Sequence, residues 1–457
     1  MITDTHFLSM KRKNNKMNQG ALEVVNALRE KGHLAFFAGG CVRDFILGVD
    51  SKDMDIATSA LPSEILNIFP KCRKIGESFG IINVVNNNID YEVATFREED
   101  SYRDGRHPER INYTKTPRVD AARRDFTINA MFYDPFSEMI LDYFDGIKDL
   151  EKGCLRTVGN PTRRFNEDYL RILRAVRFAI RFELDIQSDT YLAIKNSVRG
   201  LHKLSSERIR DELNKILTGK NPSAAIDLLF SLNILNEILP ELSNMAGVEQ
   251  SQEYHPEGDV FVHTKLMLRH MVFPTVELAW SVLLHDTGKV ETFHLDENNI
   301  PHFYNHETLS AEIGDKILTR LKFSNNQKKT ICTAVRNHMK FAHVNKMRRS
   351  KLLRMISEDS FSLQLELHRL DCISSHKILD NYNFLLDELY LMNNTPSLPP
   401  PLVTGKDLID LGWTPGPEFG KVLKHIRDMQ LEKIFISKDD AVLYIKNYPK
   451  QSISIFQ

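Results

Sequence analysis

Two acidic residues, Asp53 and Asp55, stand one residue apart in the stretch GGCVRDFILGVDSKDMDIAT at positions 39–58. Side chains at positions i and i+2 of a β-strand project to the same face, about 6.5 Å apart, so both carboxylates can reach one site. Mg²⁺ prefers oxygen ligands and binds through one or two carboxylates together with substrate phosphates, as in nucleotidyl transfer. The spacing therefore predicts a magnesium site, and Glu92, on an expected strand of the same domain, is the predicted third acid.

The glycines that open this stretch add a second chemical feature. Gly39 and Gly40 would let backbone N–H groups approach a polyphosphate, and Arg43 would add a charge-assisted contact. The order GGxVRD, then LG, then DxDxAT resembles the signature of the class II CCA-adding enzymes and bacterial poly(A) polymerases. The resemblance implies a nucleotidyltransferase head of the DNA polymerase β superfamily, with Mg²⁺ held by the two aspartates.

A second motif of the same family follows downstream. Residues 123–134 read RRDFTINAMFYD, which resembles the family's second nucleotide-contacting motif. By this resemblance, Arg124, Asp125 and Asn129 contact the ribose and triphosphate of the incoming nucleotide.

The segment NEDYLRILRAVRFAIRF, residues 166–182, has helical periodicity. On one continuous helix, Glu167 and Arg171 are i,i+4 neighbours and Asp168 and Arg171 are i,i+3 neighbours, so an acid and an arginine can hold each other. The resemblance implies that Asp168 and Arg171 pair with the base edge of CTP or ATP, while Glu167 holds the arginine. Arg174, one turn further on, completes the predicted nucleotide-binding set.

Two further segments of this region have assigned roles. The arginine-rich stretch EEDSYRDGRHPERINYTKTPRVDAA, residues 98–122, lacks a core pattern and is predicted to be a polar loop. In the family this loop is shortened in enzymes that add only CC, so its length favours addition of CCA or of A. SSERIRDEL, residues 205–213, resembles the next helical motif and is interpreted as structural support.

A second set of metal-ligand residues extends over about a hundred residues of mainly helical pattern, with the adjacent pair His285 and Asp286 at its centre. Imidazole and carboxylate together suit a divalent metal, either a transition metal or Mg²⁺. The ordered series resembles the HD phosphohydrolase superfamily, which places Lys289 at a phosphate. By this resemblance the metal ligands are His263, His285, Asp286, His306, His338 and Asp371. His255, His302 and His376 are interpreted as ordinary structural or surface histidines.

Composition limits the classes of protein and of site that this chain can represent. The chain has 457 residues, with 60 basic and 61 acidic side chains and a net charge of -1, so contacts with nucleic acid must come from local patches. The five cysteines are scattered, which argues against a disulfide framework and against a thiolate zinc site. We find no apolar run of membrane-spanning length and no signal peptide, and therefore expect a soluble, cytoplasmic protein without membrane contact.

These patterns predict an α+β protein, in which a small mixed α/β head precedes an all-α body and an all-α HD domain. The expected divisions are a flexible tail at 1–20, the head at 21–150, a helical neck and RNA-binding region at 151–250, the HD domain at 251–390, and a proline-rich linker with a helical segment at 391–457.

The resemblance implies a template-independent enzyme that adds CMP and AMP to the 3′ end of tRNA from CTP and ATP and releases pyrophosphate. Its partners would be the tRNA 3′ end and acceptor stem. Addition of A alone, or poly(A) addition, is an alternative because the head motifs are shared, although bacterial poly(A) polymerases usually lack HD ligands. Two further alternatives are an HD phosphohydrolase with an RNA-binding head and a non-catalytic RNA-binding scaffold, and the intact acids Asp53, Asp55 and Glu92 argue against both.

Overall fold

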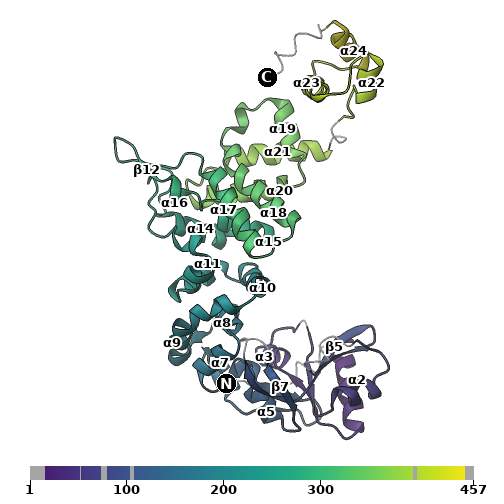
Figure 1. Ribbon diagram of the computed structural model, residues 1–457, viewed down its shortest axis with the longest axis vertical. Coiled ribbons are helices and arrows are strands. Elements are labelled where there is room, and N and C mark those ends of the chain that lie inside the picture. The colour runs from purple at the N-terminus through teal and green to yellow at the C-terminus, as the bar shows by residue number, and fades with distance from the viewer. Residues whose placement is uncertain (1–15, 52, 74–79, 103–107, 395–398, 448–457) are drawn as a thin grey trace. The chain divides into compact units, whose positions relative to one another are not determined.

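The computed structural model describes residues 16–51, 53–73, 80–102, 108–394 and 399–447. The chain divides into two compact units, Met1–Ser243 and Asn244–Gln457, and each is described by itself. In Figure 1 the first unit runs from purple to teal and the second from teal to yellow. Residues 1–15 of the predicted tail lie outside the described residues. The first described helix begins at Lys16, within the tail predicted at residues 1–20.

A seven-stranded mixed sheet forms the centre of the first unit. Its strand order is β3-β4-β5-β2-β1-β8-β9, with β2 and β5 parallel and the other neighbouring pairs antiparallel. The strands are β1 (Ala35–Ala38), β2 (Ile56–Thr58), β3 (Cys72–Arg73), β4 (Ile81–Asn86), β5 (Ile89–Thr95), β8 (Met131–Asp134) and β9 (Met139–Asp142). The helical segments around it are α2 (Lys16–Glu30), α3 (Gly40–Ile46), α4 (Pro62–Ile68), α5 (Pro117–Ala122), η2 (Thr127–Asn129) and α6 (Gly146–Glu151).

Helix α2 packs on this sheet through one apolar face. Val24, Val25 and Leu28 are almost completely buried, and the helix contacts β1, β2, β4 and β5. Apolar side chains three and four residues apart form one face of a helix, and burial of such a face is worth about 1.5–3 kcal/mol per large side chain. A second apolar cluster, which includes Phe36, Phe96 and Phe132, packs with Ala121 of α5.

A tight asparagine turn joins two neighbouring strands of this sheet. β4 and β5 are joined by Asn87 and Asn88, with φ of 52° and 62°. Asparagine tolerates this left-handed region better than most residues, and two consecutive left-handed residues are typical of the type I′ hairpin turn.

The prediction of an irregular loop at residues 98–122 is wrong. This segment contributes the antiparallel hairpin of β6 (Arg97–Tyr102) and β7 (Pro108–Tyr113), followed by α5. The strand sequences REEDSY and PERINY contain few apolar residues, so hydrophobic alternation could not reveal them. The hairpin is held by hydrogen bonds between the two backbones, which do not require an apolar face.

Helices dominate the rest of the first unit, as the sequence predicts. They are α7 (Pro161–Glu167), α8 (Leu170–Phe182), α9 (Ser188–Ser197), η3 (Val198–Lys203), α10 (Ser206–Leu217), α11 (Pro222–Ser231), α12 (Ile234–Ile238) and α13 (Pro240–Ser243). Two short parallel strands, β10 (Cys154–Leu155) and β11 (Asp185–Ile186), lie among them.

The second unit is helical apart from one short hairpin, among the residues described. Its elements are α14 (Val260–His270), α15 (Val276–Leu284), α16 (Lys289–Thr292), β12 (His294–Leu295), β13 (Pro301–His302), α17 (His306–Arg320), α18 (Asn325–Asn337), η4 (His338–Lys346), α19 (Arg349–Ile356), α20 (Phe361–Ser374), α21 (Asp380–Asn394), α22 (Gly405–Asp410), α23 (Pro417–Leu431) and α24 (Lys438–Asn447). Helices α14, α15, α17, α18 and α20 pack against one another around the fully buried Trp280 and its neighbours. The last three helices form a small apolar cluster of their own, which includes Leu408, Val422 and Ile445.

The α+β class with an α/β head followed by helices is therefore confirmed. Within the described ranges, no helix combines the length and the apolar character needed to span a membrane.

Candidate nucleotide and metal sites

The predicted acids lie at the centre of the sheet of the first unit. Strand β2 begins only at Ile56, so Asp53 and Asp55 precede it, but the expected alternation holds because Met54 between them is buried. Ile56 pairs with Val93 in the parallel register of β2 and β5, which places Asp55 beside Glu92.

Crowding of these carboxylates is visible in the pKa of Asp55. Burial, together with the negative charges of Glu92 and Asp53, raises this pKa to about 6. A divalent cation would relieve such repulsion, so the acids present fit a Mg²⁺ ion.

The glycine turn leads directly into α3. Gly39 has a φ of 69°, a conformation that favours glycine, and a Cβ added there would lie 2.7 Å from Nη1 of Arg124. Arg43 is buried, donates to Asp44 and Asn129, and lies 4.2 Å from the ring centroid of Phe182. Its guanidinium is thus engaged inside the protein, and its role at a triphosphate stays a prediction.

The predicted residues of the RRDFTINA motif form one hydrogen-bonded group. Nδ2 of Asn129 donates to Asp125 at 3.0 Å, and Arg174 from α8 donates to the other oxygen of Asp125 at 2.8 Å. Burial opposes the charge of Asp125, yet Arg174 and Asn129 outweigh it and lower the pKa of Asp125 to about 2. Arg124 pairs with the buried Asp120 at 3.1 Å. The motif is therefore tied to the helix that carries the predicted base-reading residues.

The prediction of one continuous helix over residues 166–182 is wrong. Helix α7 ends at Glu167, Asp168 is extended with φ −151° and ψ 105°, and α8 begins at Leu170. Oδ1 of Asp168 accepts from the backbone N–H of Leu170 at 3.0 Å, a local bond that competes with helix continuation. The break leaves Asp168 between the two helices.

The predicted bond between Glu167 and Arg171 is nevertheless present, at 2.8 Å. The same carboxylate also accepts from Arg164 at 2.7 Å, and Arg171 donates to the backbone carbonyl of Arg123. Arg171 is buried, so these contacts fix its guanidinium in one orientation.

Asp168 has a partner that the sequence reasoning missed. Arg208 of α10 donates from Nη2 to Oδ2 of Asp168 at 2.8 Å, and its Nη1 is buried without a hydrogen-bond partner among the residues described. Arg208 belongs to SSERIRDEL, which was interpreted only as structural support.

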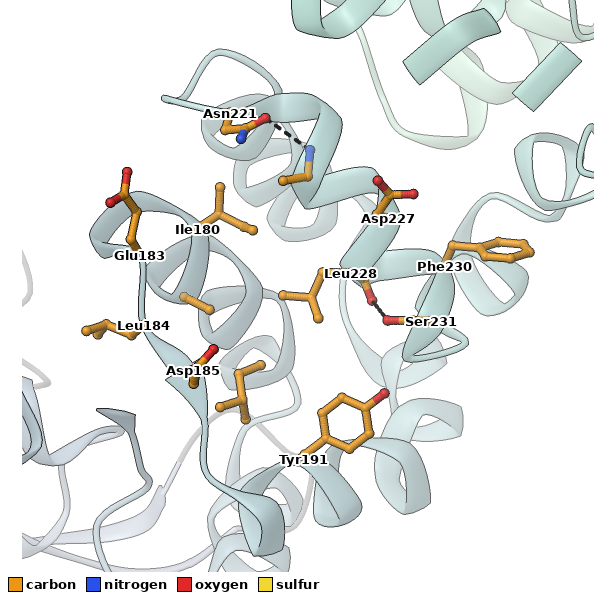
Figure 2. Close-up of a pocket in the computed structure, with 13 residues that line it drawn as sticks. Ile180, Glu183, Leu184, Asp185, Tyr191, Asn221, Asp227, Leu228, Phe230 and Ser231 are labelled. Carbon is orange, nitrogen blue, oxygen red and sulfur yellow. Dashed lines mark hydrogen bonds between the residues drawn. The ribbon is translucent and has the colours of Figure 1, made fainter. Parts of the chain in front are cut away.

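A cavity of about 880 Å³ lies elsewhere in the first unit, between α8, α9 and α11 (Figure 2). Its lining combines apolar side chains such as Ile180 and Leu228 with the acids Glu183, Asp185 and Asp227. It contains none of the predicted site residues, and carboxylates repel phosphates, so we do not assign a nucleotide to it.

In the second unit, the structure brings the six predicted HD ligands together from α14, from the residues directly after α15, from α17, from the start of η4 and from α20. Nε2 of His285 lies 3.1 Å from Oδ2 of Asp286, and Nε2 of His306 lies 3.3 Å from Oδ1 of Asp286. Nε2 of His338 lies 3.2 Å from Nε2 of His306. Nε2 of His263 lies 3.2 Å from Oδ1 of Asp371.

Buried polar atoms without hydrogen-bond partners converge in this cluster. They are Nε2 of His263, Nε2 of His285 and both carboxylate oxygens of Asp286, counted among the described residues. The close contacts of these atoms lack hydrogen-bond geometry, and buried polar groups are otherwise paired. The donor set therefore fits a divalent metal ion.

The charge states of His338 and Asp286 fit this assignment. Burial, with the nearby His285 and His306, lowers the pKa of His338 to about 3, which leaves a neutral imidazole able to ligate. Burial opposes the charge of Asp286, but His285 and Lys289 hold its pKa well below the usual range. Nζ of Lys289 forms an ion pair with Oδ2 of Asp286 at 2.8 Å and donates a hydrogen bond to Gln250 at 2.7 Å.

Glu257 is a further residue at this cluster that the sequence reasoning missed. It lies in the turn before α14, and its Oε1 accepts from Nδ1 of His263 at 2.6 Å. Glu257 lies before the helix that carries His263, so the i,i+3 and i,i+4 spacing of helical neighbours gave no signal.

Three family models match segments of the two units. The family model described as "Poly A polymerase head domain" matches residues 35–156, and the one described as "Probable RNA and SrmB- binding site of polymerase A" matches residues 183–245. The model of the HD domain matches residues 260–363.

Relatives of similar length match most of the chain. The CCA-adding enzyme of Ligilactobacillus salivarius is 32% identical over 415 residues, which cover 89% of this chain and 90% of that protein. The CCA-adding enzyme of Streptococcus mutans is 31% identical over 428 residues, which cover 93% of this chain and 96% of the relative.

Solved structures share the fold. The Bacillus stearothermophilus CCA-adding enzyme, solved in complex with CTP, has a TM-score of 0.71 at 24% identity, with 94% of this chain and 97% of that one covered. The Thermotoga maritima CCA-adding enzyme, complexed with tRNA, has a TM-score of 0.61 at 20% identity, with 96% and 97% covered. The chain therefore belongs to the family of CCA-adding enzymes and is a nucleotidyltransferase.

Proposed function

We propose that this chain adds CMP and then AMP to the 3′ end of tRNA, from CTP and ATP, and releases pyrophosphate. The family membership supports this reaction, as do the related enzymes solved with CTP and with tRNA. The observation that carries the proposal is the pair of Asp168 and Arg171, each held by a partner of opposite charge.

This pair has the hydrogen-bond character needed to select C and A. An ionised aspartate only accepts and an arginine only donates. Cytosine and adenine each present an amino donor beside a ring nitrogen that accepts, whereas uracil and guanine present a carbonyl acceptor beside a ring N–H donor. Asp168 would accept from the amino group and Arg171 would donate to the ring nitrogen, so the protein itself takes the place of a template.

The transfer step needs the acids of the head. The tRNA 3′-hydroxyl loses its proton and attacks the α-phosphorus, the new phosphodiester bond forms, and the bond to the departing pyrophosphate breaks. Asp53 and Asp55, with Glu92, would hold Mg²⁺, which when bound lowers the pKa of the hydroxyl and neutralises charge on the triphosphate. Arg124, Asp125 and Asn129 would orient ribose and phosphates, with Gly39, Gly40 and Arg43 beside them.

Basic side chains of the helical region would hold the tRNA backbone. A groove of about 570 Å³ is lined by Arg177, Arg181, Lys215 and Lys220. Cations in a groove bind phosphates, with an affinity that falls steeply as salt rises.

The test is to incubate the protein separately with tRNAs that end at the discriminator base, at C and at CC, in CTP, ATP or both. Extension of all three to CCA supports the proposal. Extension of the CC end alone would identify an A-adding enzyme, and long A tracts would identify a poly(A) polymerase. Release of phosphate without any extension would favour a phosphohydrolase with an RNA-binding head.

The second unit supports an additional function, that of a metal-dependent phosphohydrolase. The buried oxygens of Asp286, which have no hydrogen-bond partner among the described residues, favour this proposal. His263, His285, Asp286, His306, His338 and Asp371 would hold one or two divalent ions, which when bound activate a water molecule for attack on phosphorus. Lys289, buried beside Asp286, would contact the substrate phosphate.

We also propose a division of the chain by function. The head would comprise residues 21–150 and the neck residues 151–250. The HD domain would comprise residues 251–390, and the C-terminal segment residues 391–457.

A further inference from the structure

Glu257 joins two histidines at the edge of the HD cluster. A single oxygen of its carboxylate, Oε1, accepts from Nδ1 of His263 at 2.6 Å and from Nδ1 of His255 at 2.9 Å. The rings of the two histidines lie 5.0 Å apart, nearly perpendicular to each other.

The turn that carries Glu257 is held on both sides. Gly258 has a φ of 123°, which favours glycine and lets the chain reverse here. Asp259 then caps α14, since its Oδ1 accepts from the N–H of Val262 and its Oδ2 from the N–H of Gly247, both at 2.7 Å. The carboxylate of Glu257 is thereby fixed against His263.

This contact determines which nitrogen of His263 can bind a metal. An ionised carboxylate only accepts, so Nδ1 of His263 must carry the proton. The lone pair of the neutral ring is then on Nε2, which is buried, lies 3.2 Å from Asp371 and has no hydrogen-bond partner among the residues described.

The other histidines of the cluster are oriented in a different way. Nδ1 of His285, of His306 and of His338 each donates to a backbone carbonyl, at 2.8, 2.8 and 2.6 Å. Their tautomers are set by the fold and cannot be changed by substitution of an acceptor. Among these four histidines, only His263 depends on a side chain, and that side chain is negatively charged.

We propose that Glu257 is a positioning residue of the HD metal site, which holds His263 with Nε2 toward the ion and strengthens it as a ligand. The inference rests on the metal site proposed above. Carboxylates that hydrogen-bond a ligating histidine fix its ring and raise its basicity, and their loss typically lowers metal affinity by 10- to 100-fold.

The experiment measures Co²⁺ binding by calorimetry on the full chain, stripped of metal and carrying Asp53→Ala and Asp55→Ala to remove binding at the head. Glu257→Gln is expected to weaken binding about 10- to 100-fold. Glu257→Asp keeps the charge but shortens the side chain. Its Co²⁺ affinity should lie between that of Glu257→Gln and that of the parent protein with Asp53→Ala and Asp55→Ala alone. His255→Gln removes the other partner of Glu257 and should leave the affinity unchanged.

If folded Glu257→Gln binds Co²⁺ as tightly as the parent protein does, the proposal is overturned. The visible absorption of bound Co²⁺ adds a second readout: parental band positions in the saturated variant mean that the coordination is intact, as expected of a positioning residue. Shifted bands would make Glu257 itself a ligand and also overturn it. If Asp286→Asn binds Co²⁺ as tightly as the parent, the metal site itself is wrong and the proposal fails with it.

Discussion

Arg208 donates from Nη2 to Oδ2 of Asp168 at 2.8 Å, across a separation of 40 residues. The helix break at Asp168 and this bond together hold the carboxylate that we assign to base recognition. Glu167 does the same for Arg171 from the preceding turn. Both base-reading side chains are therefore fixed before a nucleotide binds, which lowers the entropy cost of recognition.

Arg208→Ala should weaken selection of the nucleotide. Hydrogen bonds to charged groups are worth about 1.5–3 kcal/mol, so the preference for CTP and ATP over UTP and GTP should fall by roughly tenfold or more. Competition assays that compare kcat/KM for the four nucleotides measure this. Arg210→Ala, on the same helix and paired with its neighbour Asp211, is the matched control. If Arg208→Ala leaves the preference among the four nucleotides unchanged, Arg208 has no role in base recognition.

Glu167→Gln should act through Arg171. The carboxylate lies between Arg164 and Arg171, and its neutralisation leaves two like charges close together. KM for CTP and ATP should rise about tenfold while tRNA affinity stays constant. Glu183→Gln removes an exposed glutamate paired with Lys220 and serves as the control. An equal effect of both substitutions would contradict a specific role for Glu167.

Local patterns in the sequence predicted much of this structure. The long helical regions follow from periodicity, and Glu92 lies on a strand as expected. The turn at Asn87 and Asn88 is one that asparagine favours. The family resemblance is confirmed by relatives that match most of the chain. The roles assigned to individual site residues remain predictions, which substitutions at these positions test.

The features that sequence reasoning missed depend on distant or polar contacts. Arg208 reaches Asp168 from another helix, and Glu257 reaches His263 across a turn, so neither pair has a recognisable spacing. The β6–β7 hairpin has little apolar alternation, and the break at Asp168 arises from a side-chain bond to the backbone within an otherwise helical pattern.

Asp125 should make stability depend on pH in the acid range. Its pKa in the folded protein is lowered to about 2, so its stabilising contribution is complete above its unfolded pKa of about 3.9 and is lost as pH falls toward 2. The contribution is about 2 to 3 kcal/mol at 1.36 kcal/mol per pKa unit. Urea unfolding between pH 5 and pH 3 should show a shallower pH dependence in Asp125→Asn. If the free energy of unfolding changes equally with pH in the variant and the wild type, the lowered pKa of Asp125 in the folded protein is contradicted.

His285→Ala with Asp286→Ala should abolish metal-dependent phosphohydrolase activity, because it removes two ligands from the centre of the HD cluster. Nucleotide addition should continue, because its residues lie in the first unit. Release of phosphate from model phosphoesters and extension of tRNA, measured on the same preparation, check both statements. His376→Ala, at an exposed histidine outside the cluster, should change neither activity. Loss of both activities in the double variant would mean that the division of functions is wrong.

Asp53→Ala with Asp55→Ala tests nucleotide transfer at the head most directly. The measurement is incorporation of labelled CMP and AMP into a tRNA that lacks its CCA end, with tRNA binding measured in parallel. Incorporation should be abolished while binding stays close to that of the wild type, because we assign the two aspartates to the metal and not to the tRNA backbone. Transfer near the wild-type rate would contradict the assignment of Asp53 and Asp55 as the catalytic metal pair.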